Sequence, residues 1–267
     1  MASERVEAFR SLHRRGEPLL LPNPWDVGSA RALQALGFRA LATTSSGFAA
    51  TLGRMDGTVT REEAIAHGEL VAGACDLPVS ADLENGFAHE PAAVADTVTA
   101  AIDAGLAGCS IEDFSGDDAT PIYDRTLAAE RIAAAAQAAH GAIVLTARAE
   151  NYLHGRADLA DTIARLQSFQ EAGADVLYAP GITDADDIRT LVTSVDRPVN
   201  VLALPTAPNV GELASLGVAR ISVGGAFAFA AFGALVEAAR ELLEQGTYGF
   251  WRSAAAGRDL AGQAFTQ

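Results

Sequence analysis

The sequence predicts a single-domain (β/α)8 barrel, a ring of eight parallel strands each followed by a helix. Eight short apolar runs alternate with Ala-rich helical segments along the whole chain, and its 267 residues suit one such barrel. Hydrophobic residues make up 49% of the chain and aromatic residues only 6%, as expected for aliphatic α/β packing. An open, doubly wound sheet is the alternative, because strand number alone does not prove closure.

Recognisable helices separate the expected strands. A helix at 90–104 has Pro91 near its start, where proline is favoured, and a second Ala-rich helix is expected at 125–139. Glycine-containing steps at 104–108, 172–174 and 216–218 provide the left-handed residue that commonly ends a helix. The expected strands lie at 18–23, 39–44, 78–82, 108–113, 142–148, 175–180, 198–203 and 218–224.

Residues beyond about 225 predict a C-terminal helical extension. An Ala-rich helix runs to Glu244 and is followed by T-Y-G-F-W and a last helical piece. The aromatic cluster Tyr248, Phe250 and Trp251 favours packing, on this chain or on a neighbouring subunit, over ligand binding. We therefore expect one domain over 1–267, with the barrel at about 18–244 and the extension at about 226–267.

The formal net charge of −15 narrows the class of partner. This charge repels nucleic-acid phosphates and anionic lipid headgroups, so we expect neither nucleic acid nor membrane as a partner. An anionic substrate would need local positive charge from a metal, an arginine or a helix N-terminus. Cys75 and Cys109 show neither disulfide-framework nor zinc-site spacing, and Cys109 lies in a run typical of a buried strand. The charged N-terminal segment lacks the apolar core of a signal peptide, which favours a soluble, cytoplasmic protein.

Acidic residues follow two neighbouring expected strands, at the end where a parallel barrel has its active site. Asp82 and Glu84 follow the third strand, and Glu112 and Asp113 end the fourth. Alternation places Asp82 and Glu84 on one side if the extended geometry continues, with Glu112 converging on Asp82 from the next strand. Such carboxylates repel one another unless a cation bridges them, and an all-oxygen set suits Mg²⁺, with Mn²⁺ as a substitute. The alternative is a set of helix caps and solvated loop residues.

Further polar residues near the strand ends leave two interpretations open. Arg148 either forms a structural ion pair with Glu150 or holds a substrate carboxylate by a two-point contact. The run Thr44 to Gly47 is either an ordinary loop or a set of N–H donors for an anion. Asp56 lies in the turn-like segment G-R-M-D-G. We expect structural or surface roles for four histidines without metal-ligand spacing: His67, His89, His140 and His154.

Taken in order, these segments resemble the isocitrate lyase and phosphoenolpyruvate mutase superfamily. The resemblance extends from about Leu19 to about Gly233. It rests on seven ordered motifs: L-P-N-P-W-D, T-T-S-S-G-F, D-G-T-V-T-R-E-E, S-A-D-L-E-N-G, S-I-E-D, T-A-R-A-E and P-V-N-V-L. The resemblance implies a barrel that binds Mg²⁺ together with 2-oxo acids or their enol forms. It also implies a homo-oligomer, a dimer or a tetramer, in which the C-terminal helix is exchanged between subunits.

The same resemblance assigns expected roles to individual residues. The metal would be held by Asp82, Glu84 and Glu112, often through water. The substrate would be bound by Ser45, Ser46, Gly47, Trp25, Asp82, Arg148 and Asn200. The catalytic set would be Arg148, Glu112 and Asp56, the last supporting the metal shell.

The departures from the family pattern bear on the reaction. Isocitrate and methylisocitrate lyases carry a K-K-C-G-H type loop after the fourth strand, whose cysteine acts as acid or base. Here the loop reads E-D-F-S-G-D-D-A-T-P-I-Y-D, with no Cys, Lys or His. The Lys-rich lid and functional Asn of the mutases are missing as well. A shared step remains, in which Mg²⁺ and Arg148 stabilise an enolate of pyruvate type.

The sequence therefore favours a Mg²⁺-dependent C–C bond lyase or decarboxylase. Its expected substrate is a 2-oxo or 2-hydroxy dicarboxylate such as oxaloacetate. Two alternatives stay open: a phosphonopyruvate or phosphoenolpyruvate P–C mutase or hydrolase, and a non-catalytic protein that binds a 2-oxo acid. The proton donor is also open among Tyr152, Glu150 and a metal-bound water.

Overall fold

A computed structural model describes residues 2–117 and 119–265. Its strands are parallel and pair in the order β1-β8-β7-β6-β5-β4-β3-β2. The gap between β1 and β2 is bridged where the Ala42 N–H donates to the Pro22 carbonyl oxygen, at 3.1 Å. The strands are β1 (Leu19–Leu21), β2 (Leu41–Ala42), β3 (Val79–Asp82), β4 (Gly108–Glu112), β5 (Val144–Arg148), β6 (Val176–Tyr178), β7 (Val199–Leu202) and β8 (Arg220–Ser222). The (β/α)8 barrel is confirmed, and each expected strand is present though shorter than expected.

Buried Asn23 ties the closing strands together just beyond the carboxyl end of β1. Its Oδ1 accepts the backbone N–H groups of Val223 and Gly224, each at 3.0 Å. Its Nδ2 donates to the Thr43 carbonyl oxygen at 2.9 Å. One amide side chain thus joins the segments after β1, β2 and β8, and it fixes the rim on which the candidate site is built.

The helices begin and end with the local signals that the sequence carries. The two named in advance are confirmed as α5 (Pro91–Asp103) and α6 (Arg125–Ala139). The three expected glycine steps are confirmed by positive φ at Gly105 (76°), Gly173 (106°) and Gly217 (85°). The remaining helices of the barrel are α1 (Ala2–Ser11), α2 (Val27–Ala35), α3 (Ser45–Thr51), α4 (Arg61–Gly73), α7 (Leu159–Glu171), α8 (Ala185–Ser194) and α9 (Val210–Ser215).

Helix α1 packs under the amino-terminal end of the barrel. Its fully buried Phe9 belongs to a small apolar cluster with Leu21, Val144 and Val176. A Cβ atom at Gly108 would lie 2.6 Å from the Phe9 ring, so the absence of a side chain there lets the helix approach β4. The barrel is therefore closed below by apolar packing, and its other end carries the polar residues.

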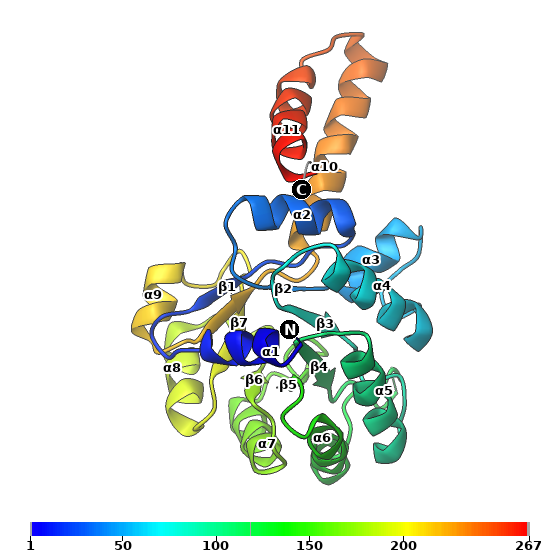
Figure 1. Ribbon diagram of the computed structural model, residues 1–267. Coiled ribbons are helices and arrows are strands. Elements are labelled where there is room, and N and C mark those ends of the chain that lie inside the picture. Colours follow the sequence, from blue (N-terminus) through cyan, green and yellow to red (C-terminus); the bar gives the residue numbers. More distant parts are fainter. Residues whose placement is uncertain (1, 118, 266–267) are drawn as a thin grey trace.

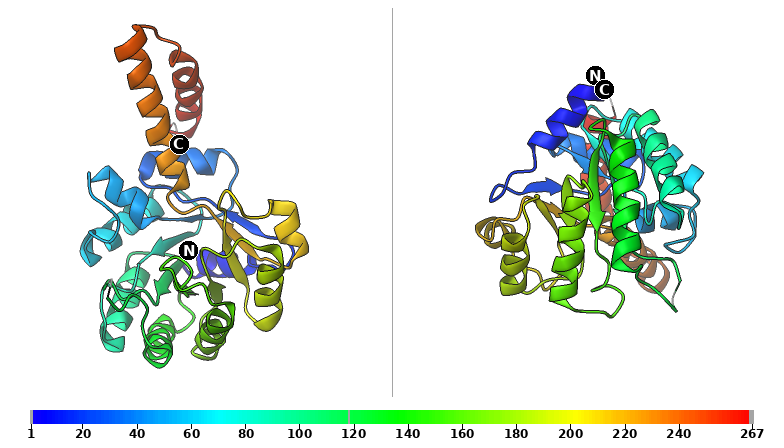
Figure 2. Two further views of the ribbon diagram at one scale, coloured as in Figure 1. Left: turned by 180° about the vertical axis from the view of Figure 1, so that it is seen from behind. Right: turned by 90° about the horizontal axis from the view of Figure 1, so that it is seen from below.

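The C-terminal extension leaves the barrel as a helical hairpin, visible in Figures 1 and 2. It consists of α10 (Ala226–Arg240), the π-helical turn η1 (Glu241–Gln245) and α11 (Trp251–Ala264), which returns to pack on α2. The extension is confirmed, while its exchange between subunits stays a prediction. Within the described part of the chain, no helix has both the length and the apolarity to cross a membrane.

Candidate active site

A cavity of about 130 Å³ opens at the carboxyl ends of the strands, and we call it the inner cavity. It is much smaller than the ~300–1,000 Å³ of sites for drug-sized ligands, which fits a small acid. Six of the residues singled out from the sequence line it: Ser45, Ser46, Asp56, Asp82, Arg148 and Asn200. The residues that the sequence places at the strand ends therefore meet at one cavity, as expected for a parallel barrel.

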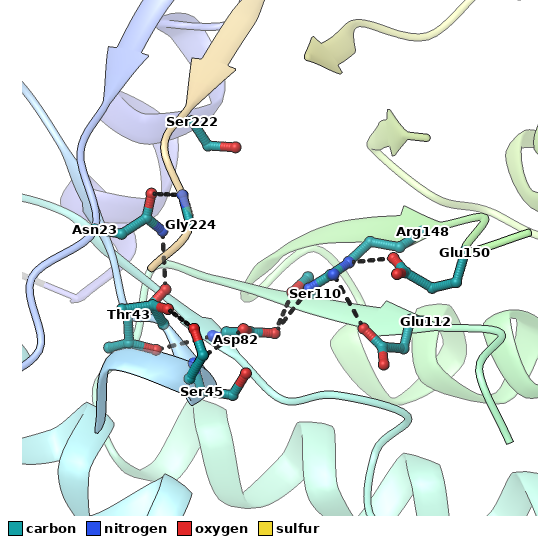
Figure 3. A network of polar contacts seen from close by, with 12 residues as sticks. Asn23, Thr43, Ser45, Asp82, Ser110, Glu112, Arg148, Glu150, Ser222 and Gly224 are labelled. Atoms are coloured by element: carbon teal, nitrogen blue, oxygen red, sulfur yellow. Dashed lines mark hydrogen bonds and ion pairs between the residues drawn. The ribbon is translucent and has the colours of Figure 1, made fainter. Parts of the chain in front are cut away.

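Arg148, the last residue of β5, contacts carboxylates from three places at once (Figure 3). Its Nη1 lies 2.9 Å from Asp82 Oδ1, its Nη2 3.2 Å from Glu112 Oε2, and its Nε 2.8 Å from Glu150 Oε1. The ion pair with Glu150 expected from the sequence is present, and two further acids share the same guanidinium. Three carboxylates against one cation leave this cluster with excess negative charge.

The electrostatics of the cluster follow from burial and crowding. Burial by itself would lower the pKa of Arg148, but Glu150, Glu112 and Asp82 together raise it, so the guanidinium stays charged. Burial raises the pKa of Glu112 well above its ordinary value, opposed by Arg148 and reinforced by the neighbouring acids. The acids therefore compete for too little positive charge.

Glu84 departs from the expected geometry. Its φ of 47° is left-handed, so the extended backbone stops after Asp82. The condition under which Asp82 and Glu84 would share one strand face is therefore not met. Burial, with Asp82 and Asp56 nearby, raises the pKa of Glu84 to about 8. Its Oε1 is fully buried and has no hydrogen-bond partner. A buried carboxyl oxygen without a partner is an unfavourable arrangement that a cation would relieve.

The segment Thr44 to Gly47 is neither a plain loop nor a free set of N–H donors. Thr44 caps the short helix α3, and the Gly47 N–H faces its Oγ1 at 3.4 Å. The Ser45 N–H donates to Asp82 Oδ2 at 3.1 Å. Asp82 is held in turn by its own N–H, which donates to Thr43 Oγ1 at 2.9 Å. The helix start thus orients the carboxylate at the cavity edge.

Four expected site residues do not line the inner cavity. Gly47 is buried behind it, where a Cβ atom would lie 2.6 Å from Thr44 Cγ2 and 3.2 Å from Trp25 Cβ. Trp25 lies on the same far side of α3, and its carbonyl oxygen is 3.0 Å from His67 Nε2. Glu84 and Glu112 instead line a wider outer hollow of about 770 Å³.

Asp56 is the residue that lines both spaces. Its pKa is raised, first by partial loss of hydration and then by Asp82, while a hydrogen bond with Ser45 and the charge of Arg148 oppose the shift. Asp56 therefore lies where the inner cavity and the outer hollow are adjacent, on the segment between α3 and α4.

The loop after β4 is anchored by a buried ion pair. Asp113 accepts the Glu150 N–H at 2.8 Å, and its Oδ2 lies 3.1 Å from Arg165 Nη1. Arg165 also donates to the Tyr123 carbonyl oxygen at 2.8 Å, so both ends of the loop meet on one guanidinium. Burial raises the pKa of Asp113 to about 6, opposed by the Glu150 N–H and Arg165. Its contacts give Asp113 a structural role.

The acidic residues fit a hard divalent cation. Glu84 has an unpartnered oxygen, and the pKa values of Glu84, Glu112 and Asp56 are all raised for lack of compensating charge. No group of three or more His, Cys, Asp or Glu side chains in residues 2–117 and 119–265 is arranged as a complete metal-binding cluster. Mg²⁺ does not require one, because it is usually held by one or two carboxylates with water and substrate completing the shell.

Tyr178, Arg220 and Ser222 are among the residues of the inner cavity that the sequence alone did not single out. Tyr178 ends β6, its hydroxyl is hydrogen-bonded to Ser222, and burial raises its pKa to about 12. Arg220 begins β8 inside the barrel. Polar residues within the apolar run V-A-R-I-S-V were the available signal, since a closed barrel turns alternate side chains of each strand inward.

With the geometry in place, comparison with known proteins identifies the family. A sequence model described as phosphoenolpyruvate phosphomutase matches residues 9–243. The chain belongs to the phosphoenolpyruvate phosphomutase family. A crystal structure of a candidate lyase/mutase from Burkholderia cenocepacia is 50% identical, with a TM-score of 0.95 over 100% of this chain and 97% of that one.

Curated relatives in the family include carbon–carbon bond-cleaving enzymes. An uncharacterized protein of Mycobacterium tuberculosis is 39% identical over 81% of each chain. The 2-methylisocitrate lyase of Escherichia coli is 30% identical over 80% of this chain and 76% of its own length. An oxaloacetate decarboxylase of Pseudomonas entomophila is 29% identical over 87% of this chain and 83% of its own. The recognised superfamily is thus confirmed.

Proposed function

We propose that this protein is a Mg²⁺-dependent C–C bond lyase or decarboxylase that acts on a small 2-oxo or 2-hydroxy dicarboxylate, with oxaloacetate as the first candidate. The observation that carries the proposal is the convergence of Asp82, Glu112 and Glu150 on Arg148 beside a cavity of about 130 Å³. The similarity to an oxaloacetate decarboxylase and a 2-methylisocitrate lyase supports the reaction class.

The composition removes a competing route. A lysine amine can form an imine with a 2-oxo acid and so take up the electrons of the broken C–C bond. The sequence contains no lysine, since all of its 19 basic residues are arginines. Without a lysine imine, an enolate can hold those electrons, and it requires positive charge near its oxygens.

Asp82, Glu84 and Glu112 would hold the cation, with Asp56 beside them. When bound, Mg²⁺ would supply a Lewis acid for the 2-oxo and carboxylate oxygens of the substrate. The Arg148 guanidinium would orient the same oxygens. Ser45 and Ser46 would contact the substrate from the start of α3.

For oxaloacetate, the bond between C3 and C4 breaks, the C4 carboxylate leaves as CO₂, and the electron pair forms the enolate of pyruvate. A proton must then reach C3. Glu150 is 3% exposed and engaged with Arg148, and neither it nor Tyr152 lines the inner cavity. Tyr178 does line it, and its raised pKa keeps the hydroxyl protonated at neutral pH, so we propose Tyr178 as the proton donor.

We also propose a homo-oligomer. The extension exposes large apolar side chains on α10, among them Phe229 (53%) and Leu235 (62%), and also Leu243 (85%) on η1. Exposed apolar surface of this extent is typical of a subunit contact. Exchange of the C-terminal helix between subunits would cover it, and sedimentation of the full chain beside a Leu235→Glu variant tests this proposal.

The test of the reaction is pyruvate formation from oxaloacetate. A coupled assay measures the pyruvate, once with MgCl₂ and once with EDTA. Oxaloacetate decomposes slowly with Mg²⁺ alone, so the metal-only rate is subtracted. Asp82→Asn should abolish the enzymatic rate, whereas Asp103→Asn, an exposed aspartate of α5, should retain it.

Loss of all turnover above the metal-only rate would sink the decarboxylase proposal, and methyl-substituted malates would then test C–C cleavage more widely. Phosphate release from phosphonopyruvate would instead favour a P–C bond hydrolase. Mg²⁺-dependent oxalate binding without any turnover would favour a protein that only binds 2-oxo acids.

A further inference from the structure

The floor of the inner cavity carries a buried charge that the proposed function leaves without a role. Arg220, the first residue of β8, is 4% exposed and lines the cavity. Its Nε donates to Asn200 Oδ1 at 3.0 Å, and its Nη1 donates to Thr146 Oγ1 at 3.1 Å. The same Nη1 lies 3.3 Å from His13 Nε2. These contacts fix the guanidinium inside the barrel.

Every one of these partners is neutral. His13 Nδ1 lies 2.8 Å from the Phe9 carbonyl oxygen, so Nδ1 carries the proton and Nε2 is the acceptor that faces Arg220. Burial, and then the charge of Arg220, lowers the pKa of His13 to about 3, which keeps the ring uncharged. Across the described ranges of the chain, no carboxylate forms an ion pair with Arg220. A buried charge without a counter-ion is unfavourable.

One nitrogen of this guanidinium, Nη2, is left without an acceptor within the described residues. Three side-chain polar atoms of the described residues have neither a hydrogen-bond partner nor contact with open space: Glu84 Oε1, Arg131 Nε and Asn151 Oδ1. Arg220 Nη2 is not among them, so it faces open space. Because the side chain is buried and lines the inner cavity, the space that Nη2 can reach is that cavity.

The wall above Arg220 leaves room for a ligand. Ala42, Ser80 and Ser110 line the cavity at positions where a barrel interior usually carries large branched residues. The two arginines of the cavity differ in their surroundings, since Arg148 is matched by three carboxylates and Arg220 by none. Positive potential in the cavity therefore comes chiefly from its floor.

We infer that Arg220 forms the floor of an anion subsite that takes one carboxylate of a small acid, deeper in the barrel than the carboxylate cluster around Arg148. The inference rests on the proposed function only in taking the ligand to be a carboxylate of that substrate. Occupation of the subsite would pair the buried guanidinium and anchor one end of the acid, leaving its other end at the level of Asp82.

Formate, the smallest carboxylate, is the probe, and EDTA is present so that no metal contributes. Thermal unfolding of the full chain is followed with increasing formate. The control is gluconate at the same ionic strength, because gluconate is too bulky for a cavity of about 130 Å³. The melting temperature of the wild type should rise with formate and stay level with gluconate. Arg220→Met should lose the response, and Arg220→Lys, which keeps the charge, should retain most of it.

A matched control separates charge from packing. Thr146→Val removes one hydrogen bond of Arg220 and keeps its charge, so the formate response should persist even if the basal melting temperature falls. An equal response in Arg220→Met, or no response in the wild type, would overturn the subsite. Neither result depends on turnover. Formate binding therefore tests the subsite, and pyruvate formation separately tests the decarboxylase proposal.

A second measurement covers the case in which Arg220→Met does not fold. In protein labelled with ¹⁵N-arginine, the Nε–H signal of Arg220 is assigned by its disappearance in Arg220→Lys. Saturating formate should shift that signal, whereas gluconate should leave it unchanged. A signal that ignores formate would contradict the subsite.

Discussion

Arg148 Nη1 lies 2.9 Å from Asp82 Oδ1, an ion pair between the ends of β5 and β3 in which both side chains are nearly buried. The same guanidinium also holds Glu112 and Glu150, so its charge is engaged by the protein itself. A substrate carboxylate would have to share Arg148 with these acids. Added positive charge at this level would free the arginine for the substrate, which links metal binding to substrate binding.

Replacing Arg148 with methionine tests this link. The change leaves three carboxylates without their cation, and breaking a buried ion pair costs about 3–5 kcal/mol of unfolding free energy. We expect a lower melting temperature in EDTA, a larger stabilisation by Mg²⁺ than in the wild type, and loss of pyruvate formation. Thermal unfolding with and without millimolar MgCl₂ measures the first two. An equal Mg²⁺ effect in both proteins would contradict the shared role of arginine and metal.

Gly47→Ala should destabilise the protein by displacing the start of α3. The new Cβ would lie 2.6 Å from Thr44 Cγ2 and 3.2 Å from both Trp25 Cβ and Ala228 Cβ. Overpacking of this kind typically costs about 1–3 kcal/mol. Because Ser45 and Asp82 meet at this helix start, activity should fall as well. Denaturant unfolding and the pyruvate assay measure the two effects.

Thr44→Ser provides the matched test of the clash. It removes the methyl group nearest the new Cβ and keeps the hydroxyl that caps α3. The double variant should recover part of the stability lost in Gly47→Ala. No recovery would mean that Trp25 or Ala228, and not Thr44, sets the limit.

The sequence was sufficient for the features that depend on local pattern. Alternating apolar runs and helix ends predicted the barrel, and the position of Asp82, Glu112 and Arg148 at the ends of their strands predicted that these side chains would meet. The direction of Glu84 could not be predicted, because the strand ends before it at a left-handed φ that nothing in S-A-D-L-E-N-G marks. Arg220 was missed because its inward direction depends on barrel closure, a property of all eight strands together.

Asp113 and Arg165 should be strongly coupled. Arg165→Met leaves Asp113 buried at 1% exposure without its cation, which should cost about 3–5 kcal/mol. The double variant with Asp113→Asn should cost less than the sum of the single changes, with a coupling of about 1–3 kcal/mol. Denaturant unfolding of the four proteins gives the value. The exposed pair Arg189 and Asp186 on α8 is the control, and its coupling should stay below about 1 kcal/mol. Equal couplings for the two pairs would contradict a structural role for Asp113.

His13 should make the protein less stable in mild acid. Its pKa falls from 6.5 to about 3 on folding, because the ring is buried beside Arg220. Below the unfolded pKa of 6.5 the unfolded chain binds a proton that the folded chain does not, so this contribution to stability is complete above that pH and is lost as the pH falls toward 3. Burial raises the pKa of Glu84 and of Asp113, so these two acids increase the unfolding free energy as the pH falls, opposite to His13. The effect of His13 is therefore measured against a variant that keeps both acids.

His13→Gln is that variant, since the amide can accept from Arg220 and does not titrate. Between pH 6 and 4 the unfolding free energy of the wild type should fall more steeply than that of His13→Gln, by a difference approaching about 1.4 kcal/mol per pH unit for one proton. Above about pH 7.5 the two slopes should coincide, because His13 is then neutral whether folded or unfolded. Urea unfolding at a series of pH values provides both slopes. If the two curves of unfolding free energy against pH run parallel through the acid range, His13 takes up its proton in the folded protein. His13 would then not be the neutral acceptor that we place beside Arg220.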